Sequence, residues 1–191
     1  MLDIRPGSQG NRFRAERIAL LKGLVDRVLA DKPRCRIIDV GGTYTFWDVW
    51  KDQIDWNRTE IVCANLNPSH ASEGKGKTPV TMFQADARRL EGIENKSFDI
   101  AFSNSVIEHV GRWSDMKSMA AEIDRVADRH LVQTPNYWFP IEPHARTPFL
   151  HWIPEPLACR IVMMKKCGYW RKASNMDEAM QSVQSAHLLN L

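Results

Sequence analysis

The chain has 191 residues, which is about the length of one globular domain and enough to bury a sizeable hydrophobic core. Hydrophobic residues make up 43% and charged residues 26%, and this ordinary balance excludes collagen-like, coiled-coil and wholly disordered chains. The formal net charge of +3 does not require a nucleic-acid partner, and no apolar run is long enough to span a membrane.

The four cysteines, Cys35, Cys63, Cys159 and Cys167, are scattered along the chain without the C-x-x-C spacing of a zinc or redox site. This pattern is typical of reduced thiols and not of a disulfide framework. The amino-terminal segment also lacks the apolar stretch of a secretory signal. These features predict a cytoplasmic protein, and we expect no metal site.

Residues 1–12 are polar and rich in glycine and proline, which predicts a flexible lead. Apolar residues then recur at helical spacing and predict an amphipathic helix over about 12–31. The elements expected after it are a strand over 36–40, a short helix over 46–54, strands over 61–64, 80–83 and 98–102, a helix over 114–127, a strand over 130–133, and helices from about 154 and from about 174, the last opened by a capping box of Ser174 and Asp177.

Strands that alternate with helical or loop connections predict an α/β fold with a doubly wound, mostly parallel, Rossmann-like sheet and helices on both faces. Ligands of such sheets bind beyond the carboxyl ends of the strands. The polar residues that follow each predicted strand are therefore the candidate site.

Gly41 and Gly42 directly follow the first strand and open a helix. Glycine allows a sharp turn and a close ligand approach, and the strand-end Asp39 can accept hydrogen bonds from loop amides or from a ligand's ammonium group. A plain strand-to-helix turn is the alternative. The G-x-G-x-x-G dinucleotide fingerprint is absent, because Thr43 and Phe46 stand at its second and third glycine positions.

Asn65 ends the second strand, and Asp86 with Ala87 ends the third. An acceptor at the position of Asn65 commonly reads ribose hydroxyls, although an Asx turn explains it equally well. A carboxylate at Asp86 can accept from an exocyclic amine while the Ala87 N–H points at a ring nitrogen. The alternative is a cap for a short turn over 87–90.

Together these segments resemble the class I S-adenosylmethionine-dependent methyltransferases, in their small-molecule branch. The matching runs are Ile37–Thr43, Asn65–Leu66, Gln84–Ala87, Ser97–Ile100, Ser103–Val110, which is similar to the family's fourth motif, and Thr134–Pro140 continuing to His144, which resembles an unassigned bacterial subgroup. The resemblance covers about residues 34–155.

The resemblance implies S-adenosylmethionine as cofactor and assigns it a set of contacts. Asp39, Gly41 and Gly42 would hold its methionine part, Asn65 and Leu66 the ribose and one adenine face, Asp86 and Ala87 the adenine edge, and Ser103 and Asn104 would lie beside the sulfonium. The chain departs from the family in having threonines where further glycines usually stand, and Asn65 where a carboxylate usually stands.

Methyl transfer depends chiefly on positioning the acceptor in line with the methyl group, and a general base is needed only where the acceptor must lose a proton. The candidates are His109, Glu142 and His144, although His109 can simply be packed and Glu142 simply exposed. The aromatic residues of the same region form either a pocket wall or a small satellite core: Tyr137, Trp138, Phe139, Phe149 and Trp152.

We expect residues 1–191 to form a single methyltransferase-like domain, with a cofactor-binding core over 34–136, a substrate-side cap over 137–173 and a C-terminal helix over 174–191. The family's sheet has seven strands and five are predicted here, so its C-terminal strands are expected to be missing or shortened, in a natural short form or an incomplete chain. The fifth strand then becomes a sheet edge that can pair with a second copy, which predicts a homodimer.

The sequence therefore predicts methyl transfer from S-adenosylmethionine to a small-molecule or sugar-like acceptor, with no nucleic-acid partner and no membrane span. One alternative is a cofactor-binding or interaction module without catalysis. Another is a nicotinamide-dependent oxidoreductase, which the missing glycine fingerprint disfavours.

Overall fold

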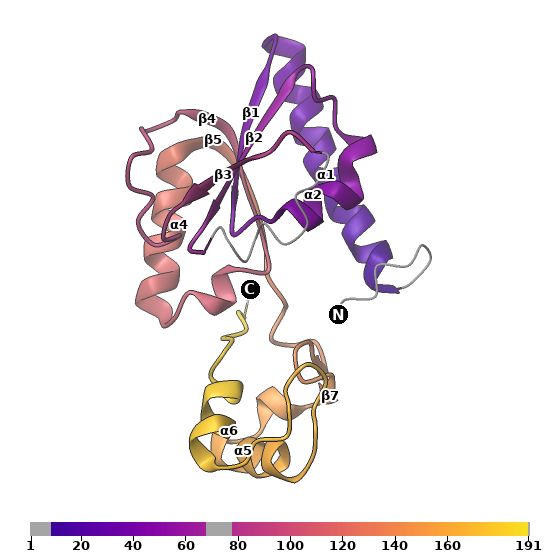
Figure 1. The fold of residues 1–191 in the computed structure, drawn as a ribbon, viewed down its shortest axis with the longest axis vertical. Coiled ribbons are helices and arrows are strands. Elements are labelled where there is room, and N and C mark those ends of the chain that lie inside the picture. Colours follow the sequence, from indigo (N-terminus) through magenta and orange to yellow (C-terminus); the bar gives the residue numbers. More distant parts are fainter. Residues whose placement is uncertain (1–8, 68–77, 191) are drawn as a thin grey trace. The chain divides into compact units, whose positions relative to one another are not determined.

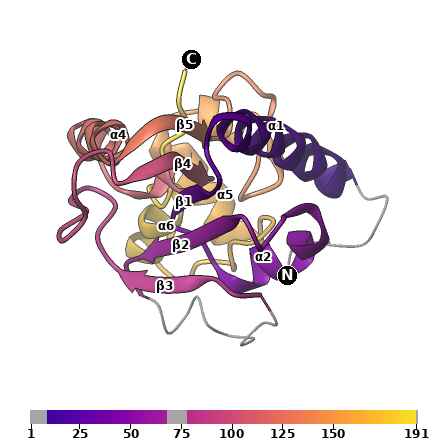
Figure 2. The ribbon, with the colours of Figure 1, turned by 90° about the horizontal axis from the view of Figure 1, so that it is seen from above.

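A computed structural model describes residues 9–67 and 78–190 and contains a five-stranded sheet (Figures 1 and 2). The strands are β1 (Cys35–Val40), β2 (Thr59–Asn65), β3 (Thr81–Gln84), β4 (Phe98–Asn104) and β5 (Ala127–Gln133), in the spatial order β3-β2-β1-β4-β5. The pairs β1–β2, β1–β4 and β2–β3 are parallel. The predicted Rossmann-like, mostly parallel sheet is thus confirmed, and all five strands lie within a few residues of their expected positions.

Helices cover the sheet on both faces, with α1 (Gln9–Asp31) and α2 (Tyr44–Trp50) to one side and α4 (Trp113–Val126) to the other (Figure 1). A 3-10 turn, η1 (Lys51–Gln53), continues α2, so the helix predicted over 46–54 is found with an earlier start. The helix α1 begins at Gln9, so the flexible lead predicted over 1–12 is wrong for residues 9–12; residues 1–8 lie outside the described part. No helix among the described residues is long and apolar enough to cross a membrane.

Burial explains why these segments became strands and helices. Both β1 and β4 are covered on two faces, so they consist of almost continuous apolar residues. One side of α1 packs on them, and Trp47 of α2 is fully buried in the same cluster. The buried members of this core are Ile18, Leu21, Val25, Val28, Cys35, Ile37, Trp47, Ile54, Ile61, Cys63, Val80, Ile100 and Phe102.

The described chain groups into two compact units, and the single domain that the sequence predicted stays a prediction. The first unit comprises the described residues up to Asn104 together with Lys117–Val132. The second unit comprises Ser105–Met116 and the chain from Gln133 onward. It therefore takes in the predicted cap segment, the C-terminal helix and the fourth sequence motif after Asn104.

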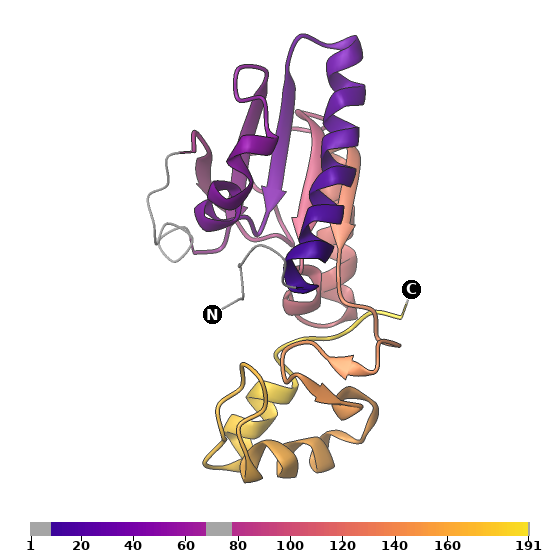
Figure 3. The same ribbon diagram turned by 90° about the vertical axis from the view of Figure 1, so that its right-hand side faces the viewer.

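The second unit contains a short hairpin and two helices (orange to yellow in Figure 3). Its elements are η2 (Ile107–His109), β6 (Ile141–Glu142), β7 (Thr147–Pro148), η3 (Leu150–Trp152), α5 (Glu155–Met164) and α6 (Met176–Val183). Its core consists of small and medium side chains: Ala145, Leu150, Ala158, Cys159, Val162, Cys167, Ala173 and Ala179. All four cysteines of the chain are buried free thiols, as the sequence predicted.

Two details of the C-terminal segment differ from expectation. Asn175, not Ser174, caps α6 by accepting from the Glu178 N–H, because the capping position lies one residue later than predicted. The strands β6 and β7 pair with each other and not with the main sheet, which leaves β5 at its edge among the described residues. The homodimer expected from that edge stays a prediction.

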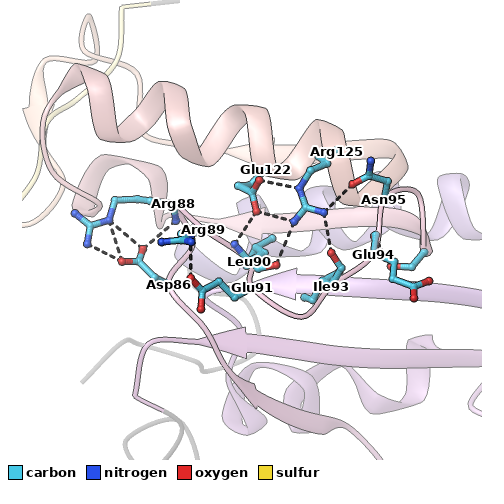
Figure 4. Close-up of polar contacts among 11 residues, drawn as sticks. Asp86, Arg88, Arg89, Leu90, Glu91, Ile93, Glu94, Asn95, Glu122 and Arg125 are labelled. Carbon is cyan, nitrogen blue, oxygen red and sulfur yellow. Dashed lines mark hydrogen bonds and ion pairs between the residues drawn. The ribbon is translucent and has the colours of Figure 1, made fainter.

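The connection between β3 and β4 is held to α4 by one guanidinium group (Figure 4). Arg125 donates to the carbonyl oxygens of Ile93 at 2.7 Å and Leu90 at 3.1 Å, and its ion pair with Glu122 measures 2.7 Å. Glu122 in turn accepts from the Leu90 N–H at 2.7 Å. This network fixes the segment that follows Asp86.

Replacing this arginine tests how much the network stabilises the first unit. We expect Arg125→Ala to lower the free energy of unfolding by about 1–3 kcal/mol, because the half-buried Ile93 carbonyl loses this donor and Glu122 loses its ion pair. Arg89→Ala is the matched control, since Arg89 is 80% exposed and its pair with Glu91 is solvated; it should change stability by less than about 0.5 kcal/mol. Urea unfolding measures both, and equal losses would contradict the assignment.

Candidate functional site

A cavity of about 300 Å³ lies beyond the carboxyl ends of β1 and β4, within the first unit. This volume is at the lower end of the roughly 300–1,000 Å³ common for small-molecule pockets. The lining residues come from the ends of the two strands, the turn after β1, and α2: Asp39, Gly41, Gly42, Thr43, Thr45, Phe46, Val49, Trp50, Phe102 and Asn104. Four of the predicted cofactor residues, Asp39, Gly41, Gly42 and Asn104, are among them.

Asp39 places a buried carboxylate at the edge of this cavity. The residue is only 2% exposed, and its Oδ2 accepts a hydrogen bond of 2.8 Å from the indole N–H of Trp47. Burial raises the pKa of the Asp39 carboxyl to about 7, and the single hydrogen bond from Trp47 offsets only part of that effect. The group is therefore poised to change charge near neutral pH, and a cationic ligand would favour its ionised form.

The two glycines shape the backbone that passes this carboxylate. Gly41 has φ of 86°, a left-handed conformation that favours glycine, and its N–H donates to the Ala64 carbonyl at 2.7 Å. A Cβ on Gly42 would overlap the Asp39 carboxylate. Thr43 then caps α2 by accepting from the Phe46 N–H. The glycine pair is thus required both by the turn and by the packing of Asp39.

Asn104 lines the cavity and has an amide oxygen without a hydrogen-bond donor, whereas its neighbour Ser103 is hydrogen-bonded within the sheet. The Oδ1 atom of Asn104 is buried and has no hydrogen-bond partner in the structure. The Ser103 hydroxyl donates to the Val40 carbonyl at 2.9 Å and thereby fastens β4 to β1. A buried acceptor without a donor is costly, so the arrangement favours a ligand that donates a hydrogen bond to Asn104.

The Asn65 amide is engaged by the chain at both ends. Its Nδ2 donates to the Gly42 carbonyl at 3.1 Å, and its Oδ1 accepts from the Asn67 N–H at 3.0 Å in an Asx turn. The Asx turn that the sequence offered as an alternative is therefore present, and Asn65 holds the glycine turn in place. Leu66 is 66% exposed, and the ribose and adenine roles of these two residues stay predictions.

Asp86 is bound by its own turn (Figure 4). The Arg88 backbone N–H donates to Oδ1 at 2.9 Å, and the Arg88 guanidinium reaches Oδ2 at 2.6 Å. Hydrogen bonding from the Arg88 side chain is the largest cause that holds the pKa of Asp86 below its usual range. The Asp86 carboxylate is thus ionised and bonded to its neighbour Arg88. Ala87 is half-buried, and recognition of an adenine edge by Asp86 and Ala87 stays a prediction.

The three candidate bases, His109, Glu142 and His144, all belong to the second unit. The two imidazole rings meet edge to face with centroids 4.9 Å apart. The alternative that Glu142 is simply exposed is wrong, because the residue is only 4% exposed at the end of β6. Although burial opposes its charge, hydrogen bonds from the His144 ring and the Ala145 N–H hold the pKa of Glu142 below its usual range.

Most of the aromatic residues predicted for this region lie on the surface of the second unit. Trp138, Phe139, Phe149 and Trp152 are each at least 40% exposed, and the Trp152 ring lies tilted against two of the others. Tyr137 lines a smaller cavity of about 190 Å³ within the second unit. The exposure of the other four side chains excludes the satellite core for most of the cluster.

A parallel sheet with a glycine turn after β1, and a cavity at the strand ends lined by a carboxylate and an amide, is the arrangement of a Rossmann-like nucleotide-binding fold. Residues 33–130 match the family model described as "Methyltransferase domain", and the chain belongs to that family. The residues of the cavity fit a ligand with a cationic amine and hydrogen-bond donors.

Two relatives match part of the chain, and solved structures support the fold. The uncharacterized proteins Rv1509 and MT1557 of Mycobacterium tuberculosis (strains H37Rv and CDC 1551) are each 33% identical over 78 residues, which cover 41% of this chain. The match spans 26% of either relative's length. Among solved structures, the DszA carbon methyltransferase superposes with a TM-score of 0.58 at 13% identity, over 71% of this chain and 38% of that one. The CurJ carbon methyltransferase gives 0.51 at 13% identity, over 62% and 35%.

A methyl group added at the second glycine of the turn tests the geometry of the cavity. We expect Gly42→Ala to displace the Asp39 carboxylate, to destabilise the first unit by about 1–3 kcal/mol and to weaken cofactor binding. Gly23→Ala is the control, because a Cβ added to Gly23 in α1 would meet no atom within 4 Å and alanine favours a helix by about 1 kcal/mol. Urea unfolding of both variants should give opposite signs; a harmless Gly42→Ala would contradict the geometry.

The raised pKa of Asp39 makes the stability of the chain depend on pH. The folded state keeps a proton that the unfolded chain loses above its ordinary pKa of 3.8, so stability falls as pH rises from about 4 through 7. The amide introduced by Asp39→Asn carries no charge at any pH. We therefore expect the unfolding free energy of this variant, relative to the parent protein, to rise by about 2–3 kcal/mol between pH 5 and pH 8. Urea unfolding of both proteins at the two pH values measures this difference. The same difference at pH 5 and at pH 8 would refute the prediction.

Proposed function

We propose that the chain transfers a methyl group from S-adenosylmethionine to a small-molecule or carbohydrate-type acceptor. The observation that carries the proposal is the cavity at the ends of β1 and β4, which is lined by the buried Asp39, the glycine turn and Asn104, whose Oδ1 has no hydrogen-bond partner. A cytoplasmic location belongs to the same proposal.

These groups match the polar parts of the cofactor. The ionised Asp39 would attract its ammonium group, and Asn104 would accept from an N–H or O–H of the ligand. When bound, S-adenosylmethionine supplies an electrophilic methyl group on a positively charged sulfur. The chain's task is then to bind the cofactor, orient the acceptor and keep water out, because positioning accounts for most of the rate of such a displacement.

Proton removal from the acceptor would fall to the imidazoles of the second unit. Glu142 accepts from His144 at Nδ1, at 2.8 Å, so the Nε2 atom of that ring carries the free lone pair. The Glu142 carboxylate also accepts from the Ala145 N–H, which commits it to the turn. Within the proposal, Glu142 is a positioning residue, and His144 and His109 are the candidate bases.

Hydride transfer with a nicotinamide cofactor has less support. Phe46 lines the cavity where a dinucleotide fingerprint has its third glycine, so a large ring occupies the close approach that a pyrophosphate needs. Membership of the methyltransferase-domain family also disfavours hydride transfer. A cofactor-binding module without catalysis is the alternative that binding and turnover measurements together distinguish.

Calorimetry with S-adenosylhomocysteine and with NAD tests the cofactor. We expect binding of S-adenosylhomocysteine and none of NAD, and Asn104→Ala should weaken the former about tenfold, the value of one buried hydrogen bond. Asn57→Ala, an exposed asparagine outside the cavity, is the matched control and should bind normally. Tight binding of NAD alone would overturn the proposal.

Turnover is tested separately, with methyl release measured across hydroxyl, amine, carboxylate and activated carbon acceptors, including simple sugars. Product with any small acceptor supports methyl transfer, and His144→Ala should lower kcat for acceptors that must lose a proton. Binding of S-adenosylhomocysteine without product in the whole panel would favour the non-catalytic module.

A further inference from the structure

Three side chains of the second unit bring potential metal ligands together. Glu108 and His109 are consecutive in η2, and His144 lies in the turn between β6 and β7. One carboxylate oxygen and one ring nitrogen from each histidine lie within 4.8 Å of one another. Residue spacing alone does not reveal this site, because 35 residues separate His109 from His144 along the chain.

Hydrogen bonds orient both imidazoles as in metal-binding histidines. Nδ1 of His144 lies 2.8 Å from Oε1 of Glu142, and Nδ1 of His109 lies 2.7 Å from the carbonyl oxygen of Ser185. Both partners are acceptors, so each Nδ1 carries the proton and each Nε2 keeps its lone pair. Ligating histidines usually donate their second N–H to a carboxylate or a backbone carbonyl in this way, which fixes the tautomer and the ring.

Glu108 supplies the independent observation. The residue is fully buried, at 0% exposure, in a unit whose core is apolar. Its Oε2 accepts a 3.0 Å hydrogen bond from the Thr134 hydroxyl, whereas its Oε1 is buried and has no hydrogen-bond partner. A buried carboxylate oxygen without a donor is costly unless a cation compensates its charge.

We infer that Glu108, His109 and His144 form a binding site for one divalent transition-metal ion of the Zn²⁺ type, with two imidazole nitrogens and one carboxylate oxygen as ligands. This donor set suits Zn²⁺ and its first-row neighbours better than Mg²⁺ or Ca²⁺, which prefer oxygen ligands alone. Three protein ligands leave a coordination position open for water or for an oxygen of a bound molecule.

The geometry needs only a small adjustment to hold such an ion. Bonds of about 2.1 Å to a tetrahedral metal bring its ligand atoms to roughly 3–4 Å from one another. His109 is exposed, so its ring can move inward without disturbing the core, while Glu108 and His144 are held by Thr134 and Glu142. The inference does not rest on the proposed methyl transfer, and an ion bound here would occupy the Nε2 lone pairs of both imidazoles and so remove them as bases.

Titration of the full-length chain with Co²⁺ tests the site, with visible absorption as the readout, followed by calorimetry with ZnCl₂. We expect one ion per chain with a dissociation constant well below about 1 mM. His109→Ala and Glu108→Gln should each weaken binding at least about tenfold, and Glu142→Gln should weaken it about 10–100-fold by releasing the His144 ring. His130→Ala, an exposed histidine of β5, is the matched control and should bind as the parent protein does.

Circular dichroism and urea unfolding without metal show whether each variant is folded. His109→Ala changes an exposed side chain, so it tests the site even if Glu108→Gln does not fold. Undiminished binding in the His109→Ala/His144→Ala double variant, or no stoichiometric Co²⁺ or Zn²⁺ binding to the parent chain, would overturn the inference. Calorimetry with S-adenosylhomocysteine on the same samples separates this outcome from a failure of the proposed function.

Discussion

The contact between the Asp39 carboxylate and the backbone at Gly42 is the constraint on which the first unit's site depends. The carboxylate lies where β1 ends, held by the Trp47 indole, and it occupies the space that any side chain at residue 42 would need. The turn must therefore be made of glycine and must pass close to the carboxylate. Asn65 pins the same turn from β2, so neighbouring strand ends are tied to one small volume.

This constraint costs stability and prepares the site for a ligand. A carboxylate with one donor in an apolar surrounding is destabilised when charged, which is why its pKa rises to about 7. A cation placed beside it recovers that free energy, and the unpartnered oxygen of Asn104 would gain its missing donor at the same time. Stability of the chain alone and affinity for a cationic ligand are thus opposed at Asp39, as is common where binding groups are preorganised.

The first unit is well predicted from sequence because β1 and β4 are buried on both faces, so their apolar runs end abruptly at polar residues. Local chemistry also identified Gly41, Gly42 and Asn104. It could not tell that Arg88 binds Asp86, or that the Ser103 hydroxyl donates to Val40, because both depend on where neighbouring groups point. In the second unit the sequence predicted the helices α5 and α6 but not the hairpin, whose strands are two residues long, nor the exposure of the aromatic residues.

The two buried glutamates of the second unit illustrate what only the fold shows. Both Glu108 and Glu142 are at most 4% exposed, beside a core of small side chains that contributes little hydrophobic stabilisation. Glu142 accepts from His144 and Ala145, so both of its oxygens are compensated. Glu108 receives one donor, from Thr134, and its other oxygen has none. The hydrogen bond from His144 Nδ1 to Glu142 leaves Nε2 of that ring free to bind a cation. The hydrogen-bonded Glu142 thus orients one ligand of the proposed ion, and the unpartnered oxygen of Glu108 supplies another.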